Sequence, residues 1–313
     1  MKEYKTFELT DKETGEVIST TKTEIKPGTQ VGIKATTEEQ RDSYKHKLEL
    51  NKEIKAFIEE NEGVFVHLMF KYGAPIFREL EEKAPGSKCN THVIRFMMLT
   101  TCLTFGGKLF DSNKNEVKKS SLKKIWDTTS KNSIYETYNL LKECGYIYET
   151  EEGYIMINED LVIKGAIENF EELRKQDHSF TYTRVFIDNL RDMYYNTEPK
   201  QRKQLANLFK ALPYINFKYN VFCANPTESD AEKIKPLNWT DLARLCGYDD
   251  KKQVARFKKD LTSLGIFDHS VIGQFDNKAG KIIVVNPKVY YAGDDVNEVK
   301  NLQQLFDWAD GKK

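Results

Sequence analysis

The sequence predicts a mainly α-helical protein with small β-hairpins, in the α+β class. Three observations predict this class: an internal repeat, a pair of short amphipathic helices in each copy of the repeat, and alternating apolar strands after each pair. The chain has 313 residues, which suits about two domains of ordinary size. Hydrophobic residues make up 39% and charged residues 31%, so the chain can build cores beneath a highly charged surface.

The repeat relates residues 122–147 to residues 120 positions later (242 minus 122) without a gap. The match resumes at an offset of 128 (286 minus 158), so the second copy is eight residues longer between the two matching blocks. In the first block Leu122, Ile125, Ile134, Leu141, Cys144, Gly145 and Ile147 match Leu242, Leu245, Val254, Leu261, Leu264, Gly265 and Phe267. In the second block Ile157, Asn158, Leu161 and Gly165 match Val285, Asn286, Val289 and Gly293.

Each copy predicts two helices joined by a tight turn. Ser121 and Thr240 are expected N-caps of short first helices, since a hydroxyl precedes apolar residues there. After a polar break, second helices are expected at 131–143 and 251–263.

Glycines and strands complete each copy. Gly145 and Gly265 suit left-handed caps at the ends of the second helices. Alternating strands follow at 146–148 and 154–157 in the first copy, and at 266–267 and 281–285 in the second. The pattern is a helix-turn-helix followed by a β-hairpin wing, so we expect two winged helix-turn-helix modules in tandem.

The remaining chain predicts further elements and domain boundaries. We expect a β-hairpin at Tyr4–Ile25, a long charged helix from Thr36 to about Asn61, and helical segments at Val64–Leu80, His92–Leu103, Ala166–Gln176, Phe180–Tyr195, Lys200–Leu212 and Asp295–Asp310. The expected domains are an N-terminal extension (1–35), a helical region (36–88), module 1 (89–165), a helical linker (166–198), module 2 (199–293) and a C-terminal helix (294–313).

A winged helix typically binds duplex DNA, because its second helix fits the major groove while its wing reaches the backbone. Lysine plus arginine (48) balances aspartate plus glutamate (48), so any affinity for DNA must come from local charge. Two lysine-rich runs supply this local charge, although such a run taken alone is more typical of a solvated helix face. From these runs we expect DNA contacts by Lys118, Lys119, Lys123, Lys124, Lys200, Arg202 and Lys203.

The second copy is the stronger candidate DNA reader. With Val254, Phe257 and Leu261 in the core, its second helix presents polar and cationic residues outward, and arginine and glutamine read bases whereas lysine suits phosphate. The expected contacts are Lys251, Lys252, Gln253, Arg256 and Lys259 on this helix, Thr240 before it, and Lys278 and Lys281 on the wing.

The first copy is polar but less cationic. Its expected contacts are Lys131, Asn132, Ser133 and Tyr135. Its wing carries Glu149, Glu151 and Glu152, which would repel phosphate, so this copy either docks obliquely or serves as a subunit interface.

Catalytic and metal sites are not expected. Gly106-Gly107-Lys108 lacks the phosphate-loop frame, and the five histidines form no metal-binding motif. Tyr194-Tyr195 is typical of packing rather than of a nucleophile pair in the absence of a histidine cluster. The five cysteines, widely spaced, read as reduced and mostly buried thiols. We therefore expect a binding protein without cofactor or metal.

Three segments resemble RepL-type replication-initiator and DNA-binding proteins of Gram-positive plasmids and phages. They are Asp11–Ile18, Tyr154–Gly165 and Val284–Gly293, and the resemblance covers about half of the chain. The chain departs from that family in being longer and in carrying two modules. The doubled modules are similar to iteron-binding initiators, in which one module reads DNA and the other also supports dimerisation. The resemblance implies origin binding and recruitment of host replication factors.

The sequence thus predicts a cytoplasmic, sequence-specific binder of double-stranded DNA, of phage or plasmid type, that initiates replication. A transcriptional regulator with the same modules is the second hypothesis, since both functions begin with the same contacts in the groove. A protein-interaction factor that targets host replication or transcription proteins is the third, and zero net charge and the acidic first wing favour it. The chain is expected to be a monomer or homodimer without a membrane-spanning segment.

Overall fold

The alternating residues near the N-terminus form the predicted β-hairpin. In the computed structural model, β1 (Glu3–Thr10) pairs antiparallel with β2 (Val17–Ile25), from Glu3 opposite Ile25 to Thr10 opposite Val17. The chain divides into two units, residues 1–48 and 49–313, and the structure describes residues 3–10, 17–25, 64–165, 170–266, 269–277, 280–287 and 306. The helix expected from Thr36 to about Asn61 lies outside the described residues.

A three-stranded antiparallel sheet lies in the second unit, where the sequence predicted helices. Its order is β6 (Val162–Ile163), β3 (Phe65–Lys71) and β7 (Phe180–Phe186). The helix predictions for Val64–Leu80 and Phe180–Tyr195 were therefore wrong over their first halves, and helices α2 (Arg78–Lys83) and α7 (Ile187–Asn196) follow the strands. Residues 66–70 of the central strand β3 are all buried, and such a run carries no alternation that would distinguish it from a buried helix.

The segment predicted as module 1 begins with α3 (Ser87–Thr100), which confirms most of the helix predicted at His92–Leu103 but starts and ends earlier. After η1 (Phe105–Gly107) and η2 (Lys119–Ser121), α4 (Leu122–Ile125) and α5 (Lys131–Glu143) form the two-helix corner. The hairpin of β4 (Ile147–Glu149) and β5 (Ile155–Ile157) follows, and Lys118 bridges to Tyr154 at its edge. The predicted second helix and the two strands of the following hairpin are confirmed in this copy.

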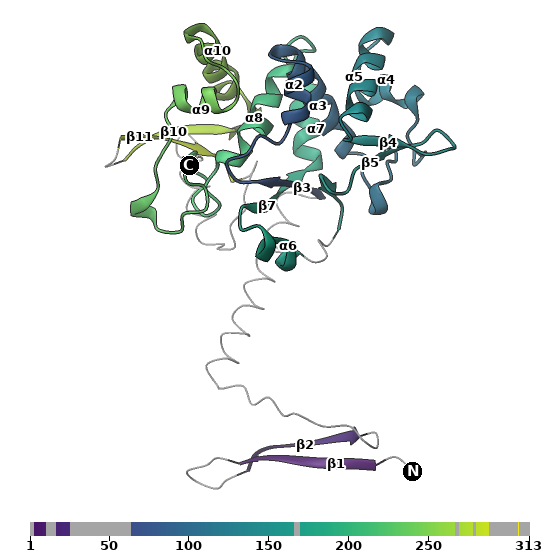
Figure 1. Ribbon diagram of the computed structural model, residues 1–313, viewed down its shortest axis with the longest axis vertical. Helices are drawn as coiled ribbons and strands as arrows, with labels where there is room; N and C mark the ends of the chain where they lie inside the picture. Colours follow the sequence, from purple (N-terminus) through teal and green to yellow (C-terminus); the bar gives the residue numbers. More distant parts are fainter. Residues whose placement is uncertain are drawn as a thin grey trace. The chain divides into compact units, whose positions relative to one another are not determined.

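The second copy follows α6 (Phe170–Gln176), η3 (Arg202–Leu205), α8 (Ala206–Ala211), η4 (Leu212–Tyr214) and η5 (Ala231–Lys233). Its corner consists of α9 (Trp239–Leu245) and α10 (Lys251–Thr262). The N-cap of α9 is Asn238, which accepts from the Asp241 N–H, and not the expected Thr240. Figure 1 shows α5 and α10 at one edge of this unit, with the β4–β5 and β10–β11 hairpins at opposite sides.

The wing of the second copy differs from the prediction. Its long hairpin pairs β10 (Ile272–Asn277) with β11 (Gly280–Val285), whereas residues 265–266 form the short strand β8 (Gly265–Ile266), which pairs with β9 (His269–Ser270). Ile272 opposite Val285 corresponds to Ile147 opposite Ile157. The offsets are 125 (272 minus 147) and 128 (285 minus 157), so five of the eight extra residues lie before the hairpin and three lie within it.

Matching asparagines close the two hairpins in the same way. The Asn158 side chain donates to the Gly145 carbonyl at 3.0 Å, and its N–H donates to the Tyr146 carbonyl. The Asn286 side chain donates to the Ser270 carbonyl at 2.9 Å, and its N–H donates to the Val271 carbonyl. The repeat therefore extends from apolar pattern to individual hydrogen bonds.

A cation–π contact also recurs, with its two partners exchanged. In the first copy the Lys119 ammonium lies 4.6 Å from the centroid of the Tyr138 ring, and in the second the Lys258 ammonium lies 5.7 Å from the Trp239 centroid. Positions 119 and 239, and positions 138 and 258, are each 120 residues apart. Both contacts fasten the start of the corner to its second helix.

One large apolar core joins both copies to the central sheet. Val66, Phe96, Trp126, Phe222 and Phe257 all belong to it and are nearly fully buried. A second cluster contains Val221, Val284 and Phe306, and the Phe306 ring meets Phe275 edge to face. Phe306 is the one described residue of the predicted C-terminal helix, and it packs on the hairpin of the second copy. The cysteines are unpaired, and four of the five are buried.

Gly145→Ala is expected to lower the free energy of unfolding by about 1–2 kcal/mol, the cost of placing an L-residue in the left-handed region. Gly145 has φ 74°, and Tyr146 N–H and Gly145 N–H close α5 through the carbonyls of Leu141 and Lys142. A Cβ there would meet no atom within 4 Å, so the cost is confined to the backbone.

Gly265→Ala is the matched control. The left-handed cap predicted at Gly265 was wrong, because α10 ends at Thr262 and Gly265 pairs with Ser270 in β8. Its substitution should change stability by no more than about 0.5 kcal/mol in urea denaturation. Equal losses for the two variants would contradict the difference in backbone conformation.

Candidate nucleic-acid interface

Helix α10 presents a cationic face to solvent. Its N-cap Asp250 accepts from the backbone N–H groups of Lys252 and Gln253, at 2.8 and 2.9 Å. Phe257 and Leu261 bury the opposite side, with Val254 partly buried. The predicted contacts on this helix are therefore all exposed: Lys251, Lys252, Gln253, Arg256 and Lys259. Thr240 on α9 and Lys281 on β11 are exposed as well, and Lys278 lies outside the described residues.

Helix α5 presents a more mixed face. Lys131, Asn132, Tyr135 and Glu136 are exposed there. Ser133 is half-buried instead, because the Arg95 guanidinium donates to its carbonyl at 2.7 Å and to its Oγ at 2.9 Å. Ser133 is thus hydrogen-bonded to α3, and this contact weakens the prediction that Ser133 contacts DNA.

The acidic first wing is partly neutralised within the chain. Glu149 accepts from the Tyr138 hydroxyl at 2.7 Å and pairs with Lys142 and Lys119 at 3.2 and 3.4 Å. The Tyr138 hydrogen bond, followed by those of the two lysines, holds the pKa of Glu149 below its usual value. Of the three wing acids, Glu151 and Glu152 remain fully exposed.

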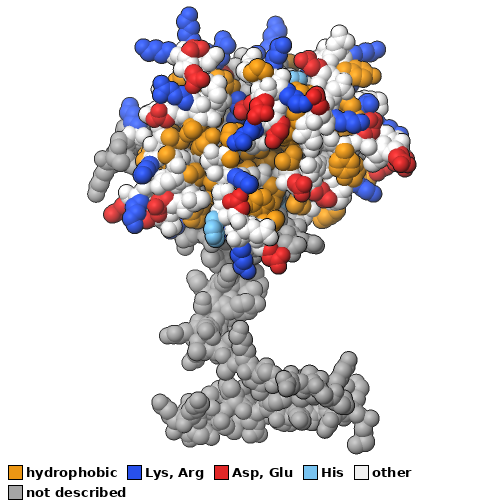
Figure 2. Space-filling view, viewed as in Figure 1, with side chains coloured by type: hydrophobic (Ala, Val, Ile, Leu, Met, Phe, Trp, Pro, Cys, Tyr) orange, Lys and Arg blue, Asp and Glu red, His pale blue; other side chains and the backbone are white. Residues whose placement is uncertain are grey.

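The lysine-rich runs divide into surface and interior positions. Lys118, Lys119, Lys123, Lys124, Lys200 and Lys203 are exposed. Figure 2 shows Lys and Arg side chains gathered along the edge of the unit that carries α10 and α5. Arg202 was also predicted to contact DNA, but it is only 7% exposed and its guanidinium binds partners inside the protein.

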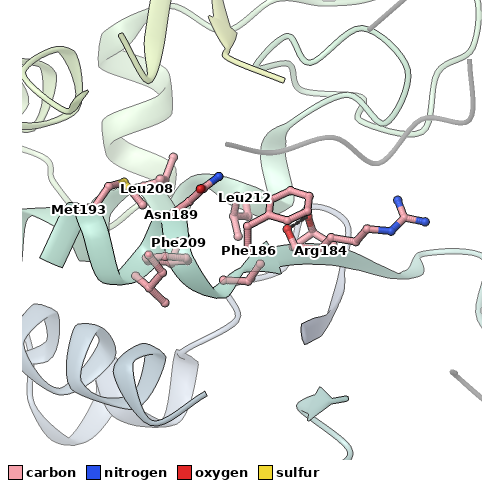
Figure 3. Close-up of a pocket in the computed structure, with 10 residues that line it drawn as sticks. Arg184, Phe186, Asn189, Met193, Leu208, Phe209 and Leu212 are labelled. Atoms are coloured by element: carbon pink, nitrogen blue, oxygen red, sulfur yellow. Dashed lines mark hydrogen bonds between the residues drawn. The ribbon is translucent and has the colours of Figure 1, made fainter. Parts of the chain in front are cut away.

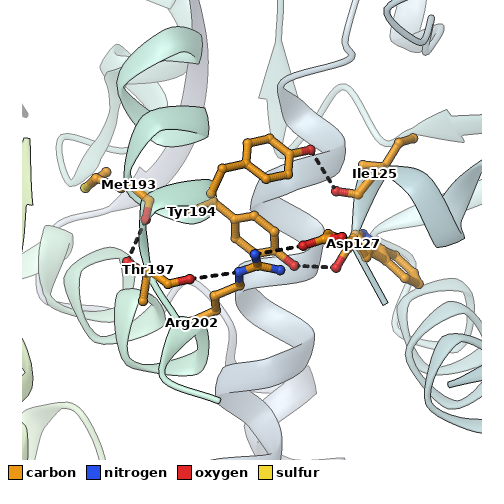
Figure 4. A network of polar contacts seen from close by, with 8 residues as sticks. Ile125, Asp127, Met193, Tyr194, Thr197 and Arg202 are labelled. Atoms are coloured by element: carbon orange, nitrogen blue, oxygen red, sulfur yellow. Dashed lines mark hydrogen bonds and ion pairs between the residues drawn. The ribbon is translucent and has the colours of Figure 1, made fainter. Parts of the chain in front are cut away.

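Arg202 belongs to a network that fastens α7 and η3 to the loop after α4 (Figure 4). Its Nη2 donates to Asp127 Oδ2 at 2.8 Å, and its Nε donates to the Thr197 carbonyl at 3.1 Å. The guanidinium carbon lies 4.5 Å from the Tyr194 ring centroid. The hydroxyls of Tyr194 and Tyr195 donate to the carbonyls of Trp126 and Ile125, which are structural roles.

Residues from separate runs of the sequence meet in a cleft of about 390 Å³ beside α10. Gln253 and Arg256 of α10, Lys203 of η3 and Ser87 at the start of α3 all line it. Beneath them the buried Asp260 carboxylate accepts from the Asn207 amide at 3.3 Å, and burial raises its pKa despite the opposing effect of Arg256. The cleft thus brings two predicted cationic segments to one place.

A second groove of about 400 Å³ lies between α4 and α5 of the first copy. Lys119, Lys123, Lys131 and Tyr135, all predicted contacts, line it. Each copy therefore has predicted contact residues beside one groove or cleft.

A third cavity, of about 20 Å³, lies between β7, α7 and α8 and is large enough for about one water molecule. It is lined mainly by apolar side chains, and the Arg184 guanidinium extends away from the other labelled residues (Figure 3).

Some residues on and beside the exposed face of α10 were not predicted from the sequence. Lys258 is exposed on α10 and stacks on Trp239, whose Nε1 donates to Gln274 of β10 at 2.9 Å. Lys258 follows Lys251 by seven residues, so helical periodicity placed both on one face. The contribution of Ser87 and Gln204 to the α10 cleft carried no local signal, because it depends on how α3 and η3 pack.

No three His, Cys, Asp or Glu side chains gather as a metal site among the described residues, and no helix there is long and apolar enough to span a membrane. Comparison with protein-family models, with curated proteins and with solved structures gave no match to this chain.

Proposed function

We propose that the chain is a sequence-specific binder of double-stranded DNA in which each copy of the repeat is a winged helix. The observation that carries the proposal is the face of α10, where five predicted contacts are exposed along a well-capped helix, four of them in its N-terminal half. A helix of this kind fits the major groove, and an arginine can pair with the O6 and N7 of guanine. In this proposal Lys281, exposed on the hairpin of the second copy, contacts the phosphate backbone of the DNA.

The biological role we propose is initiation of replication on phage or plasmid DNA. It rests on the resemblance of residues 154–165 and 284–293 to RepL-type proteins. A DNA circle that carries the bound site should replicate when the protein is supplied in trans. A site that changes only the activity of a promoter would support the transcriptional regulator instead.

The DNA site itself is found by selecting bound fragments from a library that contains the gene and its flanks, washed at two salt concentrations. The affinity of a protein that contacts only phosphates falls steeply as the salt concentration rises, whereas a protein that reads bases keeps its preference for its own site. Enriched sites that survive high salt support the proposal. No enrichment at either salt concentration would refute it.

Arg256→Ala is expected to weaken binding to the selected site by about 1–3 kcal/mol while sparing random DNA, since the lost contact is to a base. Lys252→Ala should weaken binding to all sequences and reduce the salt slope by about one. Fluorescence anisotropy across a salt series measures both effects. Lys175→Ala, an exposed lysine on α6 away from the α10 edge, is the control (Figure 1). Equal losses on specific and random DNA for Arg256→Ala would exclude base reading by Arg256.

A further inference from the structure

The groove of the first copy combines an apolar floor with a cationic rim. Leu122 and Tyr138 are almost fully buried at its floor, beside the partly buried Ile134. Around them lie three exposed lysines, Lys119, Lys123 and Lys131, and no acidic residue lines the groove. At about 400 Å³ the groove has room for one or two large side chains.

Tyr135 leaves a large aromatic surface exposed at this groove. Its side chain is 59% exposed on α5, and the matching residue of the second copy is Ala255. Exposed tyrosines beside an apolar pocket are typical of the central residues of protein interfaces. The other matching positions differ too, since Ala243 replaces Lys123 and Asp249 replaces Thr129. The first copy therefore combines an exposed aromatic ring, a rim of lysines and a groove without acidic lining residues, and the second copy does not.

One end of the groove already binds a carboxylate. The Tyr138 hydroxyl and the Lys119 ammonium, both lining groups, contact opposite oxygens of Glu149 at 2.7 and 3.4 Å. Lys123 and Lys131 have exposed side chains farther along the same rim. A carboxylate-bearing segment could therefore extend the pairing that Glu149 begins, with its apolar side chains on the floor.

We propose that this groove binds an acidic peptide segment of another protein, anchored by an aromatic or long aliphatic side chain. Duplex DNA fits it less well, because the apolar floor of Leu122, Ile134 and Tyr138 offers phosphate no contact, whereas apolar side chains of a peptide can pack on it. The two copies then divide the work, with α10 reading DNA and the first copy recruiting a protein. This inference goes beyond the proposed DNA binding and stands without it.

The test is a selection of random displayed peptides on the full chain, followed by affinity measurements with the best enriched peptide. The expected peptides carry a net negative charge and at least one aromatic or long aliphatic residue. Tyr135→Ala and Lys123→Glu should each weaken that peptide at least tenfold, since each removes a central contact. Replacing the acids of the peptide by amides should do the same. Arg256→Ala, on the other copy, should leave peptide affinity unchanged while it lowers DNA affinity.

Enrichment of no peptide, or of peptides without acids, would overturn the inference. So would peptide binding that survives both groove variants, or a loss of duplex affinity by Tyr135→Ala equal to that of Arg256→Ala, because the groove would then serve DNA. Peptide binding by a wild-type chain that binds no DNA would refute the proposed function alone. Thermal unfolding of the two groove variants verifies that they fold, as exposed positions should allow.

Discussion

Replacing Arg202 by alanine is expected to lower the free energy of unfolding by about 3 kcal/mol, because the variant loses a buried charged group and all the contacts that this group makes. The Arg202 side chain is 9% exposed and that of Asp127 is 57% exposed, so solvent screens part of the ion pair. The larger losses are the hydrogen bond to the Thr197 carbonyl and the contact with the Tyr194 ring. Urea denaturation followed by tryptophan fluorescence measures the change.

The neighbouring Lys203→Ala provides a matched control with the opposite expectation. Lys203 is exposed at the rim of the α10 cleft, so its loss should change stability by no more than about 0.5 kcal/mol. It should instead weaken DNA binding and flatten the salt dependence, whereas the folded fraction of Arg202→Ala should bind DNA as the wild type does. A stable Arg202→Ala variant with weakened DNA binding would restore Arg202 as a surface contact.

The contrast between these two neighbours shows what the sequence could not reveal. A run of cations between Lys200 and Lys218 contains both kinds of residue, and composition gives them the same meaning. The tertiary contacts of Arg202 with Asp127, the Thr197 carbonyl and the Tyr194 ring distinguish it from Lys203. The second helices were predictable because local signals suffice there: apolar periodicity after a polar break placed α5 and α10 to within one residue.

The predictions for the two central strands, β3 and β7, were wrong for a related reason. Strand β3 pairs with β7 from Phe65 opposite Phe186 to Lys71 opposite Phe180, across more than a hundred residues of sequence. Strand β3 is a mostly buried run without alternation, whereas β7 alternates buried Thr181, Thr183 and Val185 with half-buried residues. In both, the hydrogen-bonding partner that makes the segment a strand is distant in the sequence. The hairpin of the first copy was predicted correctly because its two strands are close in sequence. In the second copy, extra residues moved the pairing from Ile266 to Ile272.

Glu81→Ala is expected to cost about 2–3 kcal/mol, because it leaves the Lys210 ammonium buried without its anion. The Lys210 side chain is 6% exposed, and its Nζ lies 2.8 Å from Glu81 Oε1, which joins α8 to α2. Burial by itself would lower the pKa of Lys210, but Tyr248 and Glu81 outweigh it, so the pKa lies above its ordinary value. Since the folded pKa exceeds the unfolded one, this stabilisation is present at neutral pH and is lost as pH rises through the folded pKa.

Two further variants separate the ion pair from the helix that carries it. Glu82→Ala changes an exposed neighbour on α2 and should be nearly neutral. In Glu81→Leu/Lys210→Met neither charge remains to be desolvated, so most of the lost stability should return. If Glu81→Ala were as stable as Glu82→Ala, the Lys210 charge would not depend on Glu81. Because Lys210 also lies 5.0 Å from the ring of Tyr248, in the turn before α10, the same variants test whether this pair holds the proposed reading helix in place. A loss of DNA affinity by folded Glu81→Ala, restored in the double variant, would establish that link.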